Sequence, residues 1–430
     1  MLNVLIKPLN ALVERYLPDP FVLVLLLTAL VMVAALLLGH VGPAQLLLAW
    51  GDGLAGLLSF SMQMMLVLTS GYLLACTQPV RRALDALASR LQSAGSAVVT
   101  VTLVAMLASY LNWGFGLVVG AFLAKAVARR VAVDYRLLVA SAYSGFVIWH
   151  GGLSGSVPLT IATAGHFTAD KIGVIGTEQT LFASFNLLII GLLLLLLPLL
   201  NYLLLPKAAE QVLVTPPPEP ELDDDSEQRG LDHQRWVNLA AALLGLGYLT
   251  LYFYQGGGLN LNSISWLFLF TAMALHGTPA RLLAALQQGI QGCSGILLQF
   301  PFYAGLMALM VQSGLAAHIA ESVVRWSDAQ SLPLWAFLSA GLINIFIPSG
   351  GGQWAVQGPV MLDAALALGA DVPKVAMAVA WGDAWTNLIQ PFWALPVLAI
   401  AGLKAKDILG FCIMQLLLSG AVIALVLRFF

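Results

Sequence analysis

Charge is scarce in this sequence. Only 9% of its 430 residues are Asp, Glu, Lys or Arg, whereas a soluble domain has about 25%, and 60% of its residues are apolar. This composition excludes a soluble globular protein and predicts an all-α protein that crosses a lipid bilayer several times. The net charge is −2 and no block of basic residues occurs, so no nucleic acid is expected as a partner.

Cysteine is also scarce, with only Cys76, Cys293 and Cys412. They lie far apart in apolar surroundings, so their spacing excludes a disulfide framework and a zinc motif. We interpret them as small residues of the core. No organic cofactor and no catalytic residue are expected, and the sequence leaves open whether a metal ion binds.

Apolar runs close to the roughly 20 residues that span a bilayer recur along the chain. Seven are predicted to be simple membrane helices: residues 21–39, 54–75, 181–205, 236–254, 259–276, 290–312 and 408–427. Residues 1–20 have apolar side chains at helical spacing, which suits an interfacial N-terminal helix or an ordinary lead-in helix. Residues 206–235 are rich in proline and acidic residues and predict a flexible cytoplasmic linker.

Two segments far apart in the chain share one pattern. Asp134 and Gly145 recur as Asp371 and Gly382, each 237 positions later (371 − 134 = 382 − 145 = 237). We therefore predict two structural repeats, residues 21–205 and 259–430, with 236–254 as one extra linking helix. Internal symmetry of this kind is typical of transporters, which hold their substrate where the repeats meet.

Each repeat contains a hydrophobic segment that is interrupted near its middle. Residues 97–124 are broken at Asn112-Trp-Gly-Phe-Gly, and residues 334–362 at Ile347-Pro-Ser-Gly-Gly-Gly. Backbone released from a helix at membrane depth must be satisfied by protein or lie in a water-filled cavity. Basic residues flank both ends of the first segment, so we interpret it as a re-entrant hairpin rather than a kinked spanning helix.

The hairpin interpretation also gives an orientation. With a cytoplasmic N-terminus, 15 of the 19 basic residues fall on the cytoplasmic side, as the positive-inside rule requires. The second repeat then starts on the opposite face of the membrane from the first. The repeats are therefore predicted to be inverted.

A second interrupted segment follows each hairpin. Residues 137–160 and 374–402 are predicted to be broken membrane helices, so that two hairpin tips and two breaks converge at the midplane. None of the four segments has a lysine or arginine in its interior. An anion would thus be bound by helix N-termini, hydroxyls and amides, which suits a single carboxylate better than a multiply charged ion.

Seven motifs together resemble one family, the bacterial short-chain fatty acid transporters associated with acetoacetate and butyrate use. The motifs are YLPDP at 16–20, WGD at 50–52, NWGFGLVVG at 112–120, GGLSGS at 151–156, LQFPFYAG at 298–305, PSGGGQW at 348–354 and QPFWALP at 390–396. The resemblance implies secondary transport of small monocarboxylates across the bacterial inner membrane. It also implies paired hairpins, a homodimer and elevator-like movement, as in a wider superfamily of carriers.

The residues at the four breaks are the candidate site. The predicted substrate-binding residues are Asn112, Trp113, Gly114, Gly116, Trp149, His150, Gly151, Gly152, Ser154, Ser156, Asn344, Ser349, Gly350, Gly351, Gly352, Gln353, Trp354, Trp385, Asn387 and Gln390. Asp383 is the acid deepest within a predicted membrane segment, and His150 titrates near neutral pH, so both are candidates for ion coupling. The coupling ion, proton or sodium, stays open.

Each assignment has a plainer alternative. Asp383 could bond a helix end, His150 could be a structural histidine, the amides could cap helices, and the tryptophans could serve packing rather than limit the acyl chain. Two other functions are also considered. A channel or ion exchanger would share the fold, and Gly152-Leu-Ser-Gly fits the serine motif of an intramembrane protease, although His276 is poorly placed to serve Ser154. We expect no enzyme.

Overall fold

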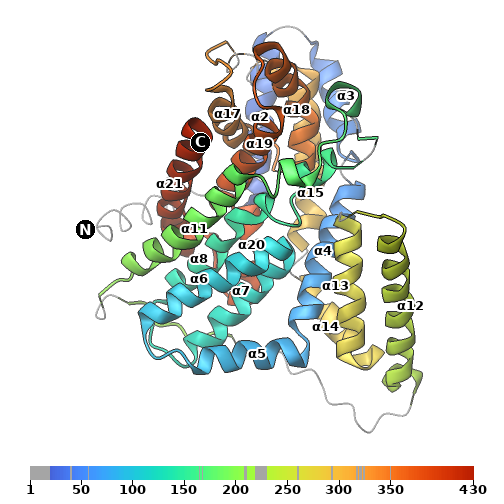
Figure 1. The fold of residues 1–430 in the computed structure, drawn as a ribbon, viewed down its shortest axis with the longest axis vertical. Coiled ribbons are helices and arrows are strands. Elements are labelled where there is room, and N and C mark those ends of the chain that lie inside the picture. The colour runs from blue at the N-terminus through green and yellow to red at the C-terminus, as the bar shows by residue number, and fades with distance from the viewer. Residues whose placement is uncertain are drawn as a thin grey trace.

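The structure is a computed structural model of the 430-residue chain. It describes residues 20–430 except 39–40, 57, 164, 167, 208–210, 218–229, 259–260, 292–293, 316–317, 319–321, 323–324 and 349. The interfacial helix predicted over residues 1–20 lies outside the described residues up to its last position, as do Cys293 and Ser349. Every regular element in the described ranges is a helix, which confirms the predicted all-α class (Figure 1).

Seven helices match the seven simple membrane helices that the sequence predicts. They are α2 (Pro20–Leu38), α4 (Leu58–Ala75), α11 (Ser184–Leu203), α12 (Arg235–Tyr254), α13 (Leu261–His276), α15 (Ser294–Gln312) and α21 (Ala405–Phe429). Within the described residues, six segments are long and apolar enough to cross a membrane: Ala94–Leu111, Tyr135–Ile161, Ser184–Leu203, Arg235–Tyr254, Val372–Ala401 and Ala405–Phe429. A polytopic membrane protein follows from these lengths.

Several helices were missed from the sequence. They are α3 (Pro43–Gly53), α5 (Gln78–Ser89), α14 (Pro279–Gln291) and the short α10 (Ala169–Ile172), η2 (Thr177–Gln179) and η4 (Leu231–His233). Amphipathic helices such as α5 carry charge on one face, in this case Arg81, Arg82 and Asp85, so a search for uncharged runs passes over them.

The helices follow one another in the same order in both halves. α3 and α14 begin 236 positions apart (279 − 43), and so do α4 and α15 (294 − 58). The packing is reciprocal as well, because α2 lies on α15 while its counterpart α13 lies on α4. Reciprocal contacts are what a pseudo-two-fold axis produces. The two-repeat design is thus visible in the helix order, and the inversion of the copies stays a prediction.

The first hairpin consists of α6 (Ala94–Leu111) and α7 (Trp113–Ala128). Asn112 alone separates them, and its Oδ1 accepts the Phe115 N–H at 2.9 Å, which caps α7. The predicted break through 112–116 is therefore shorter than expected. Gly114 and Gly116 lie inside α7, where a Cβ would collide with the Val67 carbonyl on α4 and with Ser109 on α6. These glycines permit close helix packing rather than unwinding.

The second hairpin consists of α17 (Leu332–Asn344) and α18 (Gly350–Leu368). Gln353 on α18 donates to the Ala340 carbonyl at 2.9 Å, and Gln357 donates to the Ser339 hydroxyl at 3.0 Å. These bonds join the two arms. The run Gly350–Gly352 opens α18 instead of forming the loop, and the described residues between the two arms are 345–348.

Both predicted broken helices are broken. The first consists of α8 (Tyr135–Ser144), the 3₁₀ segment η1 (Gly145–Gly151) and α9 (Ser156–Ile161); the second consists of α19 (Val372–Thr386), η5 (Asn387–Ile389) and α20 (Pro391–Ala401). Asp134 and Asp371 accept backbone N–H groups at the starts of α8 and α19. Gly145 and Gly382 each lie so close to the first arm of their own hairpin that a Cβ would overlap it. The repeated Asp and Gly thus have the same role in both copies.

Part of the predicted flexible linker is held in place. Val212 donates its N–H to Asp134 Oδ2 at 2.9 Å, and its carbonyl accepts the Tyr135 N–H at 3.1 Å. Arg129 donates to the Pro217 carbonyl at 3.1 Å. Residues 211–217 therefore follow the ends of the first hairpin and α8, contrary to the expectation of a flexible chain, because the buried Asp134 offers an acceptor. Residues 218–229 lie outside the described residues.

Candidate functional site

Each hairpin tip lies on the break of its own repeat. At the first tip, the backbone N–H of Trp113 donates to Ser154 Oγ at 3.0 Å, and the backbone N–H of Leu153 donates to the Tyr110 carbonyl at 2.7 Å. Gly152 makes this approach possible, since a Cβ there would overlap the Tyr110 backbone. Exposed backbone of the break is thus satisfied by the hairpin, as membrane depth requires.

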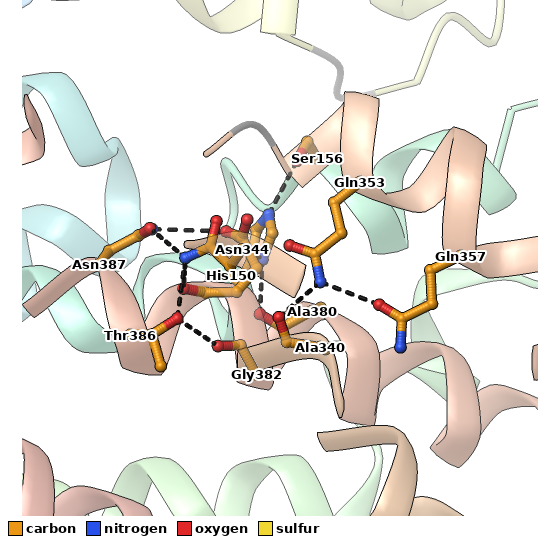
Figure 2. A network of polar contacts seen from close by, with 11 residues as sticks. His150, Ser156, Ala340, Asn344, Gln353, Gln357, Ala380, Gly382, Thr386 and Asn387 are labelled. Atoms are coloured by element: carbon orange, nitrogen blue, oxygen red, sulfur yellow. Dashed lines mark hydrogen bonds and ion pairs between the residues drawn. The ribbon is translucent and has the colours of Figure 1, made fainter. Parts of the chain in front are cut away.

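The second tip is joined to its break by an amide network (Figure 2). Asn344 Nδ2 lies 2.9 Å from the Asp383 carbonyl, 2.9 Å from Thr386 Oγ1 and 2.8 Å from Asn387 Oδ1. Gln390 Nε2 donates in turn to the Asn344 carbonyl. Asn344 ends α17, and the other residues end α19 or follow it, so the amides connect the hairpin to the broken helix.

His150 joins the two repeats at their centre. It is fully buried, with Nδ1 2.7 Å from the Ala380 carbonyl on α19 and Nε2 2.8 Å from Ser156 Oγ on its own break. Asp383 Oδ2 lies 3.5 Å from His150 Nδ1. The two candidates for ion coupling are therefore adjacent, although one comes from each repeat (Figure 2 shows His150 within the network).

Gly350 places the second hairpin against the first repeat. A Cβ at this position would overlap the imidazole of His150 and the hydroxyl of Ser156. No other residue type fits there without a shift of the tip. Gly350 is also the first residue of α18, so the amino end of this 19-residue helix lies beside His150.

Asp383 is buried with one oxygen unsatisfied. Its side chain is 1% exposed, Oδ2 accepts from Asn387 Nδ2 at 3.4 Å, and Oδ1 has no hydrogen-bond partner among the described residues. Three amide oxygens of the same region share this condition: those of Asn344, Gln353 and Gln390. All four atoms are acceptors. A buried acceptor without a partner is costly, so this side of the site calls for a proton or a cation.

Aromatic side chains surround the first tip. Trp113 lies edge-on to Trp393, with ring centroids 5.4 Å apart. The centroid of Trp113 also lies 6.2 Å from that of Trp149. Phe146 stacks on Trp149 at 5.6 Å, with the ring planes 4° apart. The indole N–H groups of Trp113 and Trp149 are buried without a hydrogen-bond partner in the described part of the chain. This side of the site thus contains unsatisfied donors.

Some predicted site residues lie elsewhere. Trp385 packs on Gly341 and Gly420 and donates its Nε1–H to the Leu416 carbonyl at 2.8 Å. These contacts match the alternative in which this tryptophan serves helix packing. Trp354 lies in the core between α18 and its neighbours. Gly151 packs on Trp381 and Asn186, so it shapes the break without facing the network. Ser349 lies outside the described residues.

Other residues of the site were not predicted. Thr386, Tyr143 and Asn186 bond the breaks: Tyr143 Oη donates to the Asn387 carbonyl, and Asn186 Nδ2 donates to the Gly151 carbonyl at 3.0 Å. Trp393 and Phe146 complete the aromatic group. A signal existed for Trp393, which lies in the motif QPFWALP, and for Asn186, a lone amide within an apolar helix. Phe146 has none, since nothing distinguishes it from a core residue.

A metal cluster is not found among the described residues, where no group of three or more His, Cys, Asp or Glu side chains could hold an ion. Ser154, the candidate protease serine, accepts the Trp113 N–H. His276 Nε2 lies 2.8 Å from the Leu73 carbonyl on α4, so the two residues have different neighbours.

Comparison with known proteins identifies the family. The model of the short chain fatty acid transporter family matches residues 1–430. A protein of Escherichia coli K12, provisionally named as a short-chain fatty acid transporter, is 41% identical over 428 residues and covers 97% of each chain. A protein of Haemophilus influenzae Rd with the same provisional name is 40% identical over 434 residues and also covers 97% of each chain.

Among solved structures, the YdaH transporter of Alcanivorax borkumensis is similar to this chain. It is 18% identical, the match covers 95% of this chain and 98% of that one, and the TM-score is 0.48. That likeness is too low to support an argument about the site.

The apolar helices and these relatives define a multi-pass membrane transporter, which is not an enzyme. The chain belongs to the short-chain fatty acid transporter family, as its motifs indicate. The protease alternative for Ser154 is excluded by this membership.

Proposed function

We propose that this protein is a secondary active transporter that moves short-chain monocarboxylates, such as butyrate or acetoacetate, across the bacterial inner membrane by alternating access. One observation supports this most. Both hairpin tips and both breaks meet around a buried polar group, and no lysine or arginine takes part in it within the part of the chain that the structure describes. Such a site suits one carboxylate on a short chain.

The packing supports movement of the hairpins and broken helices as one body. The helices α6 to α9, α11 and α17 to α21 contact one another, and α2, α3, α4, α12, α13, α14 and α15 form a second group, which meets the first where α4 packs on α7. Between the groups, Gly71 on α4 faces the backbone of Phe115, and Gly114 on α7 faces the Val67 carbonyl. Aromatic pairs also cross this boundary, with ring centroids 5.6 Å apart for Tyr72 and Phe122 and 5.2 Å apart for Phe115 and Phe268. The proposed elevator-like step would move the first group along this boundary.

Coupling to a cation is supported by Asp383. Its unsatisfied Oδ1 can carry a proton, or it can bind a sodium ion together with the amide oxygen of Asn344 or Gln390. His150 lies next to it and offers a second site for a proton. Both coupling ions therefore remain part of the proposal. We further propose a cytoplasmic N-terminus, inverted repeats and a homodimer.

Uptake into proteoliposomes tests this function. Labelled butyrate and acetoacetate are followed under an imposed pH gradient, with and without sodium, and the leak of the protonated acid into protein-free vesicles is subtracted. Accumulation driven by the pH gradient alone supports proton coupling, and accumulation that requires sodium supports sodium coupling. Saturable counterflow would separate a carrier from a channel. No uptake under either gradient would overturn the substrate assignment.

A further inference from the structure

The tryptophans near the breaks differ in whether their indole N–H is satisfied. Trp381 donates to Asn186 Oδ1 at 2.9 Å, and Trp385 donates to the Leu416 carbonyl at 2.8 Å. Trp113 and Trp149 are buried, at 1% and 3% exposure, yet their indole N–H groups have no partner in the described ranges, a condition that Trp50 on α3 and Trp354 on α18 share. Buried tryptophan usually finds a partner for this group, and Trp113 and Trp149 are the two of these four whose rings lie side by side at a break.

The two unsatisfied groups belong to one place. Trp113 is the first residue of α7, directly after the hairpin tip, and Trp149 lies in η1, directly before His150. Their rings are 6.2 Å apart between centroids. The bond from the backbone N–H of Trp113 to Ser154 Oγ, at 3.0 Å, keeps the tip on the break that contains Trp149. Both indoles therefore move with the substrate-carrying body proposed above.

The chemistry of these groups selects their ligand. An indole N–H can only donate a hydrogen bond, so its partner must be an acceptor, and an ionised carboxylate is an acceptor at every lone pair. The opposite side of the site, at Asp383 Oδ1 and Asn344 Oδ1, has acceptors without donors and would repel an anion. His150 lies between the two sides. Its ring contacts the ring of Trp149, and its Nδ1 lies 3.5 Å from Asp383 Oδ2.

We propose that the indole N–H groups of Trp113 and Trp149 bind the carboxylate of the substrate, and that Phe146 and Trp393 enclose its acyl chain. This inference rests on the proposed function and specifies which groups of the same site bind the substrate. Phe146 lies 5.5 Å from Trp393 and stacks on Trp149, so the carboxylate-binding edge continues into flat aromatic walls. Walls of this kind admit a thin, unbranched chain and exclude a second charge.

The test removes the N–H and keeps the ring. Trp113→Phe and Trp149→Phe are compared with Trp236→Phe, whose parent side chain is 61% exposed on α12 and far from the breaks. Each site variant is expected to raise the KM for butyrate roughly tenfold or more, the usual loss for a hydrogen bond to a charged group. The control is expected to stay within about twofold of the wild type.

A spectroscopic readout measures binding directly in the wild-type protein. In detergent-solubilised full-length protein with ¹⁵N-labelled tryptophan, butyrate is expected to shift two indole resonances downfield, whereas n-butanol is not. Each variant identifies its resonance by its loss. If butyrate is transported but neither resonance shifts and both KM values are unchanged, the inference is overturned while the proposed function stands. If the wild type neither transports nor binds butyrate, both are overturned.

Discussion

The two breaks have the same backbone plan but different side chains. Adding 237 to Phe146, Trp149 and His150 gives Asp383, Thr386 and Asn387, and the counterpart of Ser156 is Trp393. Each break follows an Asp-capped helix, and each contacts its own hairpin through a glycine. Yet the aromatic first break carries unsatisfied donors, and the polar second break carries unsatisfied acceptors. The repeat thus fixes where side chains meet, and their identity gives one side of the site donors and the other acceptors, on which the proposed anion and cation sites rest.

Uptake should be most sensitive to substitution at the contact between the two repeats. Gly350→Ala would drive a methyl group into His150 and Ser156, so we expect uptake to fall to background. The cause is steric, with overpacking that costs about 1–3 kcal/mol of stability. Gly191→Ala on α11 is the control, because beyond its chain neighbours and the backbone of its own helix no described atom lies within 4 Å of the place where its methyl group would stand. Initial rates of uptake at matched reconstitution provide the measurement, and a Gly350→Ala protein with wild-type rates would contradict the proposed closeness.

The acceptor side should carry the coupling. In Asp383→Asn the group can no longer bind a proton or neutralise a cation, so accumulation against a gradient is expected to be lost while exchange of butyrate stays within about threefold. Asp363→Asn serves as the control, since that side chain is 60% exposed and pairs with Lys171. Uphill uptake and counterflow are measured in the same vesicles. If Asp383→Asn accumulates substrate normally, Asp383 does not belong to the coupling site.

The two hairpin-tip asparagines should differ in their effect on stability. Asn344→Ala removes contacts to Asp383, Thr386 and Asn387 at once and leaves buried acceptors, so it should cost about 2–4 kcal/mol. Asn112→Ala removes only a helix cap, which is worth about 1 kcal/mol. Thermal unfolding in one detergent compares them. Equal losses would show that the two tips are held alike.

The smallest difference is expected between the two capping aspartates. Asp134 is fully buried and also accepts the Val212 N–H of the linker at 2.9 Å, whereas Asp371 is exposed and caps α19 alone. Asp371→Ala should therefore cost about 1 kcal/mol, as an ordinary cap does, and Asp134→Ala about twice that. Protease cleavage within residues 211–217 should also become faster in Asp134→Ala only. Cleavage that is unchanged there would mean that Asp134 does not hold the linker.

Much of the fold could be predicted from composition and spacing. Uncharged runs located α2, α4, α11, α12, α13, α15 and α21, because a bilayer imposes a length and a polarity that each segment must meet by itself. The breaks at Asn112 and Asn387 were visible as polar residues among glycine and proline in apolar segments. The helices α3, α5 and α14 were not, since an amphipathic helix is defined by what it packs against.

The sequence by itself determined the class of protein and the four interrupted segments that form the candidate site, because these depend on local polarity and on a pattern repeated along one chain. Tertiary structure alone decided which of them meet. His150 contacts Ala380 across 230 positions, and Trp393 lies against Trp113 although no spacing relates them. It also removed Trp385 from the site, since its half-buried indole donates to the Leu416 carbonyl that packing provides. Contacts between segments so distant arise only when the helices assemble, so no local pattern encodes them.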